Sequence, residues 1–291
     1  MAVRRRIGRR VCAAVSVLGL AATGCTSSTA PTGGPSRSAA SSGSRAASPS
    51  GSAAAHGWSR KRLLAAITKH PGTTHTARAN PLNAQVGAVF THNAEGDHFC
   101  TASVVDSAGQ NLIVTAAHCV YDPTTGQRSD LVFVPGYRNG EAPNGVWPLV
   151  SITVDQSWKD SGNEDMDVAF AIVQPQSGMQ IQQVLGASTL GIGKGYQLPV
   201  RITGYPSSGD APITCANNTT EQSPTQLRIE CPAYTGGTSG SPWITEPDAA
   251  SGTGTIVGVI GGYQQGGNTP DVSYTSYFGP QVRSLYDRAT G

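Results

Sequence analysis

From residue 81 to the C-terminus, short apolar runs alternate with turn-forming residues, and this alternation limits the fold more than any other feature of the chain. Short apolar runs that are bounded by Gly, Pro, Asn and Ser are typical of strands in antiparallel sheets. The 291 residues include 36 Gly and 19 Pro, and only 13% of them are charged, which disfavours long helices. The sequence therefore predicts an all-β protein.

The strands are expected in two series of six. The first series covers residues 86–90, 99–105, 112–116, 131–137, 146–154 and 168–173. The second series covers residues 197–204, 212–216, 227–231, 242–244, 256–260 and 272–277. Two such series predict two antiparallel six-stranded β-barrels that pack side by side, at about 81–185 and 186–291. A short C-terminal helix is expected at 281–288, with Val282, Leu285 and Tyr286 available for packing.

Residues 1–24 have the pattern of an export signal. A basic region from Arg4 to Arg10 precedes an apolar run at 11–22, and small residues follow. The apolar run is too short to span a bilayer, which takes about 20 residues. Removing this segment takes away five arginines and changes the formal net charge from +2 to −3. The mature chain therefore offers no electrostatic case for binding nucleic acid.

Cys25 directly follows the signal. The run Leu20-Ala21-Ala22-Thr23-Gly24-Cys25 resembles a bacterial lipobox, in which the cysteine is lipidated and becomes the new N-terminus, although Ala22 stands where Leu is more usual. If Cys12 leaves with the signal and Cys25 is acylated, four of the six cysteines remain to pair in an exported protein. The lipidated protein is expected on the extracellular face of the cell membrane. The alternative is an ordinary secretory signal cut near Cys25, which gives a secreted protein.

Residues 25–56 are almost wholly Ser, Ala, Gly, Thr and Pro. Such a segment cannot bury enough apolar surface to offset the entropy lost on ordering, so we expect a disordered tether. A connecting segment or pro-region follows at 57–80. Within it, residues 59–69 fit a short helix, with Ser59 as its N-cap and Pro71 after its end.

Ser239 lies between glycines in the run Thr235-Gly236-Gly237-Thr238-Ser239-Gly240-Ser241-Pro242-Trp243. The backbone of such a run can approach a bound carbonyl closely, and the amides of Gly237 and Ser239 are the candidates for binding an oxyanion. A serine hydroxyl is a weak nucleophile, so it needs a base and a group that orients the base. The alternative for Ser239 is a structural serine in the turn of a Gly-rich loop. The other serine of this loop is Ser241, which is followed by Pro242.

Candidates for both partners lie upstream of the serine. His118, preceded by Thr-Ala-Ala and followed by Cys, is the expected general base and then the acid to the leaving amine, because imidazole exchanges protons near neutral pH. Asp167 directly precedes the apolar run at 168–173 and is expected to orient His118. Glu164 and Asp165 are expected in a solvated loop instead.

The order His118, Asp167, Ser239, the Thr-Ala-Ala-His-Cys motif and the glycine two residues before the serine resemble the chymotrypsin/trypsin-like serine peptidases. The resemblance covers about residues 81–291. It implies two barrels with a cleft between them and a closing C-terminal helix. It also implies hydrolysis of peptide bonds through an acyl-enzyme on Ser239, with no cofactor and no metal.

Two disulfide bonds are a further implication of the resemblance. Cys100 and Cys119 match the family's disulfide beside the catalytic histidine, and such a cross-link contributes about 3 kcal/mol. Cys215 and Cys231 are the remaining pair, expected to bridge two strands that lead into the nucleophile loop. Two free buried thiols are the alternative for either pair, and they are rare in exported proteins.

Two departures from the trypsin pattern bear on activation and specificity. Thr238 stands where trypsins have an aspartate that pairs with a new N-terminus, so activation by that ion pair is not expected. The Thr-Ser-Gly-Ser-Pro run is more similar to the bacterial branch that includes glutamyl endopeptidases. Ala233 stands where trypsins have an acidic pocket residue, and the expected pocket wall at 258–263 lacks the histidine of glutamyl endopeptidases. Neither a Lys/Arg nor a Glu preference is supported, and an apolar or small side chain is the default expectation.

The sequence thus predicts an exported serine endopeptidase that acts on peptide or protein substrates. Its expected membrane contact is through a lipid on Cys25, and a monomer is the default state. Two alternatives stay open, because a fold does not by itself establish a function. One is an esterase with the same triad, and the other is an inert trypsin-like scaffold that binds at the cell surface.

Overall fold

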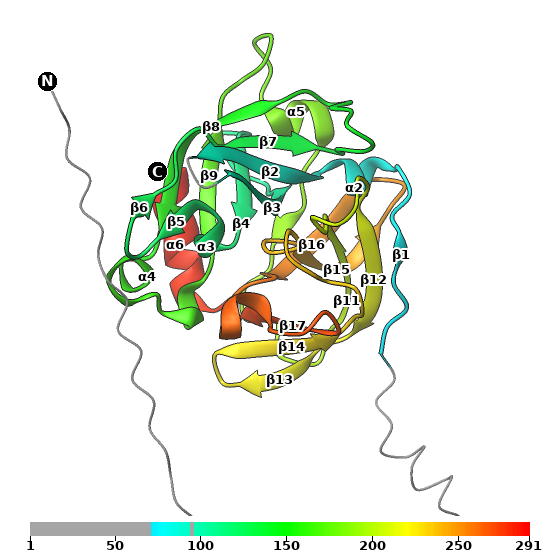
Figure 1. The fold of residues 1–291 in the computed structure, drawn as a ribbon, viewed down its shortest axis with the longest axis vertical. Helices are drawn as coiled ribbons and strands as arrows, with labels where there is room; N and C mark the ends of the chain where they lie inside the picture. Colours follow the sequence, from blue (N-terminus) through cyan, green and yellow to red (C-terminus); the bar gives the residue numbers. More distant parts are fainter. Residues whose placement is uncertain (1–70, 94–95) are drawn as a thin grey trace, which may run out of the picture. The chain divides into compact units, whose positions relative to one another are not determined.

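The protein is represented by a computed structural model that describes residues 71–93 and 96–291. The signal at 1–24, the tether at 25–56, Cys25 and the helix expected at 59–69 lie outside these residues. The described chain belongs to one unit, Arg60–Gly291, and consists mainly of β-strands (Figure 1). No helix in the described ranges is long and apolar enough to cross a membrane.

Six antiparallel strands of the first half close into a barrel in the order β2-β3-β4-β9-β8-β7, and the pairing of β2 with β7 completes the ring. The strands are β2 (Val86–Asn93), β3 (Gly96–Val104), β4 (Leu112–Thr115), β7 (Val132–Pro135), β8 (Trp147–Val154) and β9 (Ala169–Val173). Small and branched side chains fill the interior together with Phe133, Trp147 and Trp158. Every strand expected in this half is present, with ends that differ by a few residues.

Short elements connect these strands. They are α2 (Pro81–Ala84), α3 (Ala117–Val120), β5 (Tyr121–Asp122), β6 (Gly126–Gln127), α4 (Gln156–Ser161), the 3-10 helix η2 (Glu164–Met166) and α5 (Ile181–Leu185). Helix α4 begins at Asp155, whose side chain accepts a hydrogen bond from the Ser157 amide, and ends at Gly162 in the left-handed conformation. These signals were present in the sequence, but each helix is too short to give a recognisable apolar period.

The second half contains its six expected strands, divided between two sheets. A six-stranded sheet has the order β1-β12-β11-β15-β16-β10, and a three-stranded sheet has the order β13-β14-β17. The strands are β1 (His75–Thr76), β10 (Thr189–Leu190), β11 (Pro199–Gly204), β12 (Ile213–Asn218), β13 (Thr220–Ser223), β14 (Gln226–Glu230), β15 (Pro242–Asp248), β16 (Thr253–Val259) and β17 (Val272–Ser276), with the 3-10 helix η3 (Tyr263–Gly266) before β17. The two sheets enclose a core that includes Ile202, Leu227 and Trp243. The expected all-β fold is confirmed.

The chain ends in α6 (Pro280–Thr290), which returns from the second half to pack against β8 and β9 of the first barrel. Val282 and Leu285 are buried in this contact, and the Tyr286 ring meets the Phe170 ring edge to face at 5.6 Å. The helix expected at 281–288 is therefore confirmed. Because α6 joins the two halves, its packing helps to hold them together.

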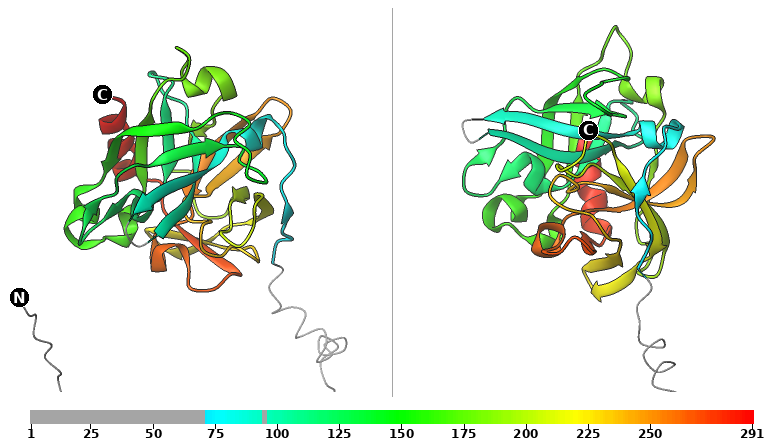
Figure 2. Two further views of the ribbon diagram at one scale, coloured as in Figure 1. Left: turned by 45° about the horizontal axis from the view of Figure 1, so that its top comes forward. Right: turned by 45° about the vertical axis from the view of Figure 1, so that its right-hand side comes forward.

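The segment before the first barrel lies along the edge of the second half (Figure 2). His75 and Thr76 pair with β12, and the Gly72 amide donates to the Glu230 carbonyl at 2.8 Å. A side chain at Gly72 would collide with the Cys215 sulfur, so this position requires glycine for close approach.

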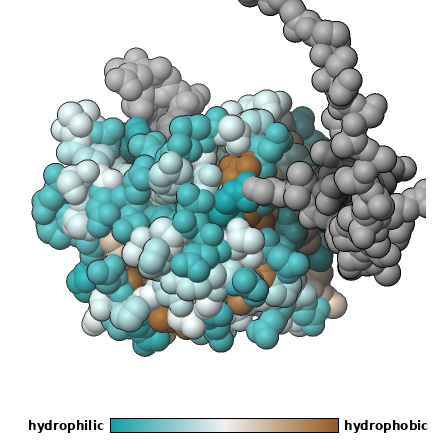
Figure 3. Space-filling view, turned by 90° about the horizontal axis from the view of Figure 1, so that it is seen from below, coloured by the Kyte–Doolittle hydropathy of each residue, from teal (hydrophilic) through white to brown (hydrophobic). Residues whose placement is uncertain are grey.

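The face seen in Figure 3 is mainly hydrophilic, with apolar residues in small separate groups. The larger exposed apolar side chains of the described residues are Val146, Val150, Met179, Val184 and Tyr263. Scattered apolar residues of this kind are normal on a folded surface.

Candidate active site

His118 and Asp167 are brought together by two neighbouring strands. His118 lies on α3, just after β4, and Asp167 lies just before β9. In the antiparallel β4–β9 pair, Thr115 lies opposite Ala169, so the end of β4 meets the start of β9. The two side chains therefore emerge at the same end of the barrel, and the His118 Nδ1 lies 2.8 Å from the Asp167 Oδ2.

The Asp167 carboxylate is fully buried and is surrounded by N–H donors. The backbone amide of His118 donates to Oδ1 at 2.9 Å, and the backbone amide of Gly262 donates to Oδ2 at 2.9 Å. With the imidazole on Oδ2, both carboxylate oxygens are occupied, which is the condition for keeping a charge in the interior. Because Oδ2 faces Nδ1, the neutral imidazole is held with its proton on Nδ1 and its Nε2 free to accept one.

Gly261 leaves the space that this arrangement needs. A Cβ on Gly261 would lie 2.8 Å from the Asp167 carbonyl oxygen and 3.1 Å from Oδ2. A larger residue there would push against the carboxylate that orients His118.

Glu164 and Asp165 are half-buried and hydrogen-bonded rather than simply solvated, which corrects the sequence-based expectation. Asp165 Oδ1 accepts a hydrogen bond from the Gln226 side chain at 2.9 Å, and Glu164 Oε1 accepts one from the backbone amide of Gln264 at 2.8 Å. The two acids attach the segment before Asp167 to β14 and η3. The sequence could not give these partners, because they lie 61 and 100 positions away.

Ser239 is half-buried in the tight loop before β15. Gly237 and Gly240 have positive φ values of 93° and 82°, which favour glycine. A Cβ on Gly240 would also collide with the Thr101 carbonyl and the Thr115 hydroxyl, so the loop lies tightly against the first barrel. Within the described residues, the Ser239 hydroxyl has no hydrogen bond to His118.

Ser241 has a structural place in the loop. Its side chain is fully buried, and its hydroxyl donates to the Thr238 carbonyl at 2.6 Å. The Thr238 hydroxyl donates to the Thr235 carbonyl at 2.6 Å. Thr238, where trypsins have an aspartate, thus supports the loop through a short-range hydrogen bond.

The amides of Gly237 and Ser239 form no hydrogen bond to any of residues 71–93 and 96–291. The carbonyls beside them are occupied, since the Thr101 hydroxyl donates to Gly237 O at 3.0 Å and the Thr101 amide donates to Ser239 O at 2.7 Å. The loop can therefore offer two amides to a ligand while its carbonyls stay bonded to protein.

The structure contains two disulfide bonds, Cys100–Cys119 and Cys215–Cys231. The first joins β3 to α3 directly beside His118, and the second joins β12 to the chain just after β14. Cys100, His118 and Cys119 have ligand atoms close enough to suggest a metal site. Both sulfurs are bonded to each other, however, so the group has no thiolate to offer a metal.

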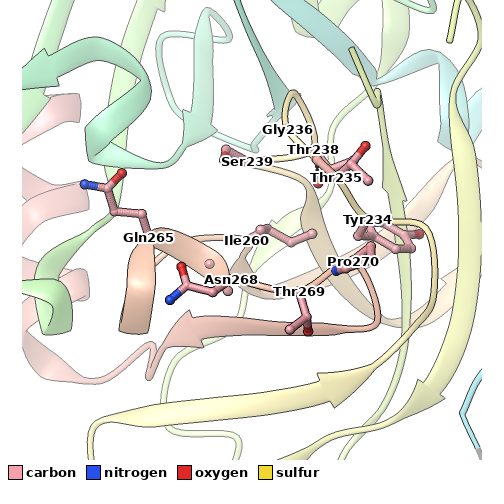
Figure 4. Close-up of a pocket in the computed structure, with 12 residues that line it drawn as sticks. Tyr234, Thr235, Gly236, Thr238, Ser239, Ile260, Gln265, Asn268, Thr269 and Pro270 are labelled. Atoms are coloured by element: carbon pink, nitrogen blue, oxygen red, sulfur yellow. Dashed lines mark hydrogen bonds between the residues drawn. The ribbon is translucent and has the colours of Figure 1, made fainter. Parts of the chain in front are cut away.

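A cavity of about 280 Å³ opens beside Ser239 (Figure 4). Figure 4 places Ile260 near its middle, Gln265 on one side, and Tyr234 and Pro270 on the other. Its lining residues are Tyr234, Thr235, Gly236, Thr238, Ser239, Ile260, Gln265, Gly266, Gly267, Asn268, Thr269 and Pro270. No lining residue carries a charge.

The pocket differs in two respects from the expectation. Ala233 is exposed and does not line the cavity, which begins at the next residue, Tyr234. Of the expected wall at 258–263, only Ile260 lines it. Burial raises the pKa of Tyr234, whose hydroxyl donates to the Ile202 carbonyl at 2.9 Å, so this side chain is a neutral wall rather than an acid.

Sequence reasoning missed Gly262 and Thr101, which contact the candidate site residues directly. The glycine pair at 261–262 was a visible signal, but its contact with Asp167 spans 95 positions. Thr101 lies next to Cys100 with no motif of its own, and its contact with Gly237 spans 136 positions.

The protein-family model for the trypsin-like peptidase domain matches residues 100–259 of this sequence. Among solved structures, the protease Anisep from Arthrobacter nicotinovorans is 25% identical, with a TM-score of 0.66, covering 75% of this chain and 99% of that chain. The thermostable serine protease AL20 from an extremophilic microorganism is 29% identical, with a TM-score of 0.65, covering 72% of this chain and 98% of that chain.

A Glu endopeptidase in complex with MPD is 16% identical, with a TM-score of 0.59, covering 77% of this chain and 99% of that chain, and it shows likeness of fold alone. No curated protein sequence matches the chain. The matched domain spans more than half of the 291 residues, and the chain therefore belongs to the trypsin-like peptidase family.

Proposed function

We propose that the protein is an exported serine endopeptidase that uses Ser239 as nucleophile, His118 as general base and Asp167 as the residue that orients the base. The observation that carries this proposal is the buried Asp167 carboxylate, bonded to both the backbone and the imidazole of His118. Desolvating a carboxylate is costly unless it is fully bonded, so a protein with no use for this pair would gain little from keeping it.

One hydrogen bond and one disulfide bond link the segment that carries Ser239 to the segment that carries His118. The Ser239 carbonyl accepts from the Thr101 amide, and the neighbouring Cys100 is bonded to Cys119, which adjoins His118. Hydrogen bonds between nucleophile and base are often long in enzymes without substrate and shorten in the reactive complex. We therefore expect the Ser239–His118 bond to form when substrate fills the site.

The proposed reaction has two halves. The Ser239 oxygen attacks the scissile carbonyl carbon as His118 Nε2 takes the hydroxyl proton, and the amides of Gly237 and Ser239 bind the resulting oxyanion. When the C–N bond breaks, His118 returns the proton to the leaving amine, which leaves an acyl-enzyme ester on Ser239. A water then attacks this ester with the same proton transfers, releasing the acid and restoring the hydroxyl. Every proton taken is returned, so the reaction needs no cofactor.

We also propose that the residue before the scissile bond has an uncharged side chain. The cavity beside Ser239 would receive this side chain. Its walls are uncharged and consist of amides, hydroxyls, glycine backbone and the side chains of Ile260, Pro270 and Tyr234. An ion entering such a cavity would lose hydration without gaining an opposite charge. This supports the default expectation of an apolar or small side chain.

The two alternatives make different demands on the site. An inert scaffold has no need for a buried carboxylate directed at an imidazole, so the Asp167–His118 contact favours the enzyme. An esterase would use the same acyl chemistry as a peptidase. Family membership favours peptide substrates.

The test is cleavage of a mixed peptide library by the purified exported protein, with the products identified by mass spectrometry. We expect new peptide termini with the wild type and none with Ser239→Ala. Ser284→Ala, on the exposed face of α6, is a matched control and should cleave normally. Hydrolysis of simple esters without any peptide cleavage would favour the esterase, and cleavage by Ser239→Ala would contradict the proposal.

For localisation, we propose export followed by lipidation of Cys25. The support is the lipobox-like run before Cys25 and the even number of cysteines that remain. Cys25→Ser should release the protein into the medium, whereas Cys12→Ser, within the signal, should leave it with the membrane fraction. Unchanged retention of Cys25→Ser would contradict the anchor and would favour another means of attachment.

A further inference from the structure

Thr101 joins the first barrel to the loop that carries Ser239. Its side chain is fully buried on β3, where the Thr101 amide donates to the Ser239 carbonyl at 2.7 Å. Its hydroxyl lies 3.0 Å from the Gly237 carbonyl oxygen and 3.0 Å from the Tyr205 amide nitrogen. One residue of the first half therefore contacts three backbone groups of the second half.

The direction of the hydroxyl bonds is fixed by their partners. The Tyr205 backbone N–H can only donate, so the Thr101 oxygen must accept from it. A hydroxyl has a single hydrogen, and the Gly237 carbonyl can only accept, so that hydrogen points at Gly237. Burial excludes water as a competing partner, and each bond is therefore worth more than it would be at the surface.

The bonded Gly237 carbonyl belongs to the peptide group between Gly237 and Thr238. This peptide lies between the two that carry the amides of Gly237 and Ser239. Gly237 has a φ of 93° and no side chain, so its own conformational preferences do not keep the peptide in one orientation. A rotation of this peptide would alter the relative directions of the two amides.

The neighbouring carbonyls are held in the same way by other donors. The Ser241 hydroxyl and amide both donate to the Thr238 carbonyl, at 2.6 and 3.0 Å, and the Thr101 amide donates to the Ser239 carbonyl. Of these three successive carbonyls, the one at Gly237 depends on a side chain from the other half of the molecule. The Thr101 hydroxyl thus holds a loop residue that has no side chain of its own to fix its conformation.

We propose that the Thr101 hydroxyl is a positioning group for oxyanion binding: by holding the Gly237 carbonyl, it keeps the amides of Gly237 and Ser239 directed at one point. The inference rests on the proposed peptidase function. It assigns to Thr101 no contact with substrate. Its effect is on the transition state, where the negative charge develops, and not on the binding of the substrate.

The variants Thr101→Val and Thr101→Ser test the positioning role of the Thr101 hydroxyl. Valine keeps the shape of the threonine side chain without the hydroxyl, and serine keeps the hydroxyl without the methyl group. Thr219→Val is a matched control: the buried Thr219 hydroxyl likewise donates to a carbonyl, that of Tyr196, and accepts from the Leu198 amide. It lies between β12 and β13, and its hydrogen bonds within the described part of the chain go to Tyr196 and Leu198 rather than to the loop around Ser239. All three variants and the wild type are compared in kcat and KM for a cleaved peptide, in the inhibition constant of its boronic-acid analogue, and in thermal unfolding.

Losing one oxyanion donor outright lowers kcat by roughly 10²- to 10³-fold, so loosening the loop in Thr101→Val should lower kcat by about 10- to 100-fold. The affinity for the boronic acid, which forms a tetrahedral adduct, should fall by a similar factor, while KM changes by less than about threefold. Thr101→Ser should keep kcat within about threefold of wild type even if it unfolds at a lower temperature. Thr219→Val should lower the unfolding temperature without the loss of kcat.

Wild-type kcat in Thr101→Val would overturn the inference, as would a loss in Thr101→Ser as large as that expected for valine. The serine variant keeps the test decisive if the valine variant does not fold. A rise in KM with an unchanged kcat would also overturn it, because that result assigns Thr101 to substrate binding. A folded wild type that cleaves no peptide would overturn the proposed function as well, which distinguishes the two failures.

Discussion

The carboxylate of Asp167 is bonded to His118 twice, to the backbone amide at 2.9 Å and to the imidazole Nδ1 at 2.8 Å. One residue therefore fixes both where the histidine backbone lies and which way its ring faces. The Gly262 amide adds a third N–H donor from the second half of the molecule. The orientation of His118 thus depends on both halves being folded.

Asp167→Asn should leave the fold intact and lower kcat by about 10⁴-fold, as expected when the base is held in the wrong tautomer. Both carboxylate oxygens face N–H groups, so the new NH₂ group must face another donor whichever way the amide turns. Peptide-cleavage kinetics and circular dichroism together check this. Asp165→Asn is the control, because an amide oxygen can still accept from Gln226, and its kinetics should stay near wild type. Equal activity of the two variants would remove Asp167 from its proposed role.

Peptides with a charged residue before the scissile bond should be cleaved at least about 10-fold more slowly than those with a neutral one. Burying the charge in the cavity is unfavourable, and each 1.4 kcal/mol of this free energy lowers the cleavage rate by a factor of about ten. A peptide library varied at that position measures this directly. Asn268→Asp would place a negative charge in the cavity lining and should raise the relative rate after Lys and Arg. Asn217→Asp, away from the cavity, should leave the preference as it is. Preferred cleavage after Lys or Glu by the wild type would contradict the proposed pocket chemistry.

Replacing Cys100 and Cys119 together by alanine should lower the free energy of unfolding by about 3 kcal/mol, because the bond closes a loop of this size. Activity should fall more than stability alone explains, since the bond joins the strand of Thr101 to the helix of His118. Guanidinium unfolding and kcat measure the two effects. The paired replacement of Cys215 and Cys231 should cost similar stability while the folded protein keeps most of its kcat. Equal losses of kcat in both pairs would show that the first disulfide has no special relation to the site.

Asp155 should stabilise the protein in a pH-dependent way. Its partial burial acts to raise its pKa, but hydrogen bonds from the Ser157 hydroxyl and amide, and from Arg288, hold the pKa below the usual range of an aspartate. A lowered pKa in the folded state means that the stabilisation is complete above the pKa of the unfolded chain and is lost as the pH falls through the folded value.

Asp155→Ala should therefore lower the free energy of unfolding by about 1 kcal/mol at pH 7, the usual effect of losing an N-cap, and by less at pH 3. Urea unfolding at both pH values is the measurement. Asp160→Ala, on the exposed side of the same helix, removes a carboxylate that accepts from the Gln156 side chain and should show a smaller effect. A loss for Asp155→Ala that is as large at pH 3 as at pH 7 would show that the charge contributes nothing.

Much of the fold could be predicted because each long strand carries its own apolar run between turns, as β4 and β9 do. The short elements could not, since β1, β5, β6 and β10 each have two residues and exist only through their pairing partners. The division of the second half into two sheets also depends on pairing, and no local pattern encodes it. Helix α6 was predictable because Gly279-Pro280 marks its start and its apolar residues recur at helical spacing.

The candidate site also has parts that the local sequence could predict and parts that it could not. Ser239 and His118 lie in local motifs that can be read from neighbouring residues, and Asp167 was preferred because a strand follows it. Gly262 contacts Asp167 across 95 positions of the sequence, and Thr101 contacts Gly237 across 136 positions. Partners this far apart cannot be read from neighbouring residues, even where a glycine pair is visible. The position of the cavity one residue beyond Ala233 likewise depends on how the loops fold back.

The most direct measurement is the reaction of the folded protein with a fluorophosphonate, followed by mass spectrometry of the digested product to locate the adduct. We expect one adduct, on Ser239, which is absent from Ser239→Ala and forms much more slowly in His118→Ala. No adduct on the folded wild type, or an adduct on a serine other than Ser239, would contradict it.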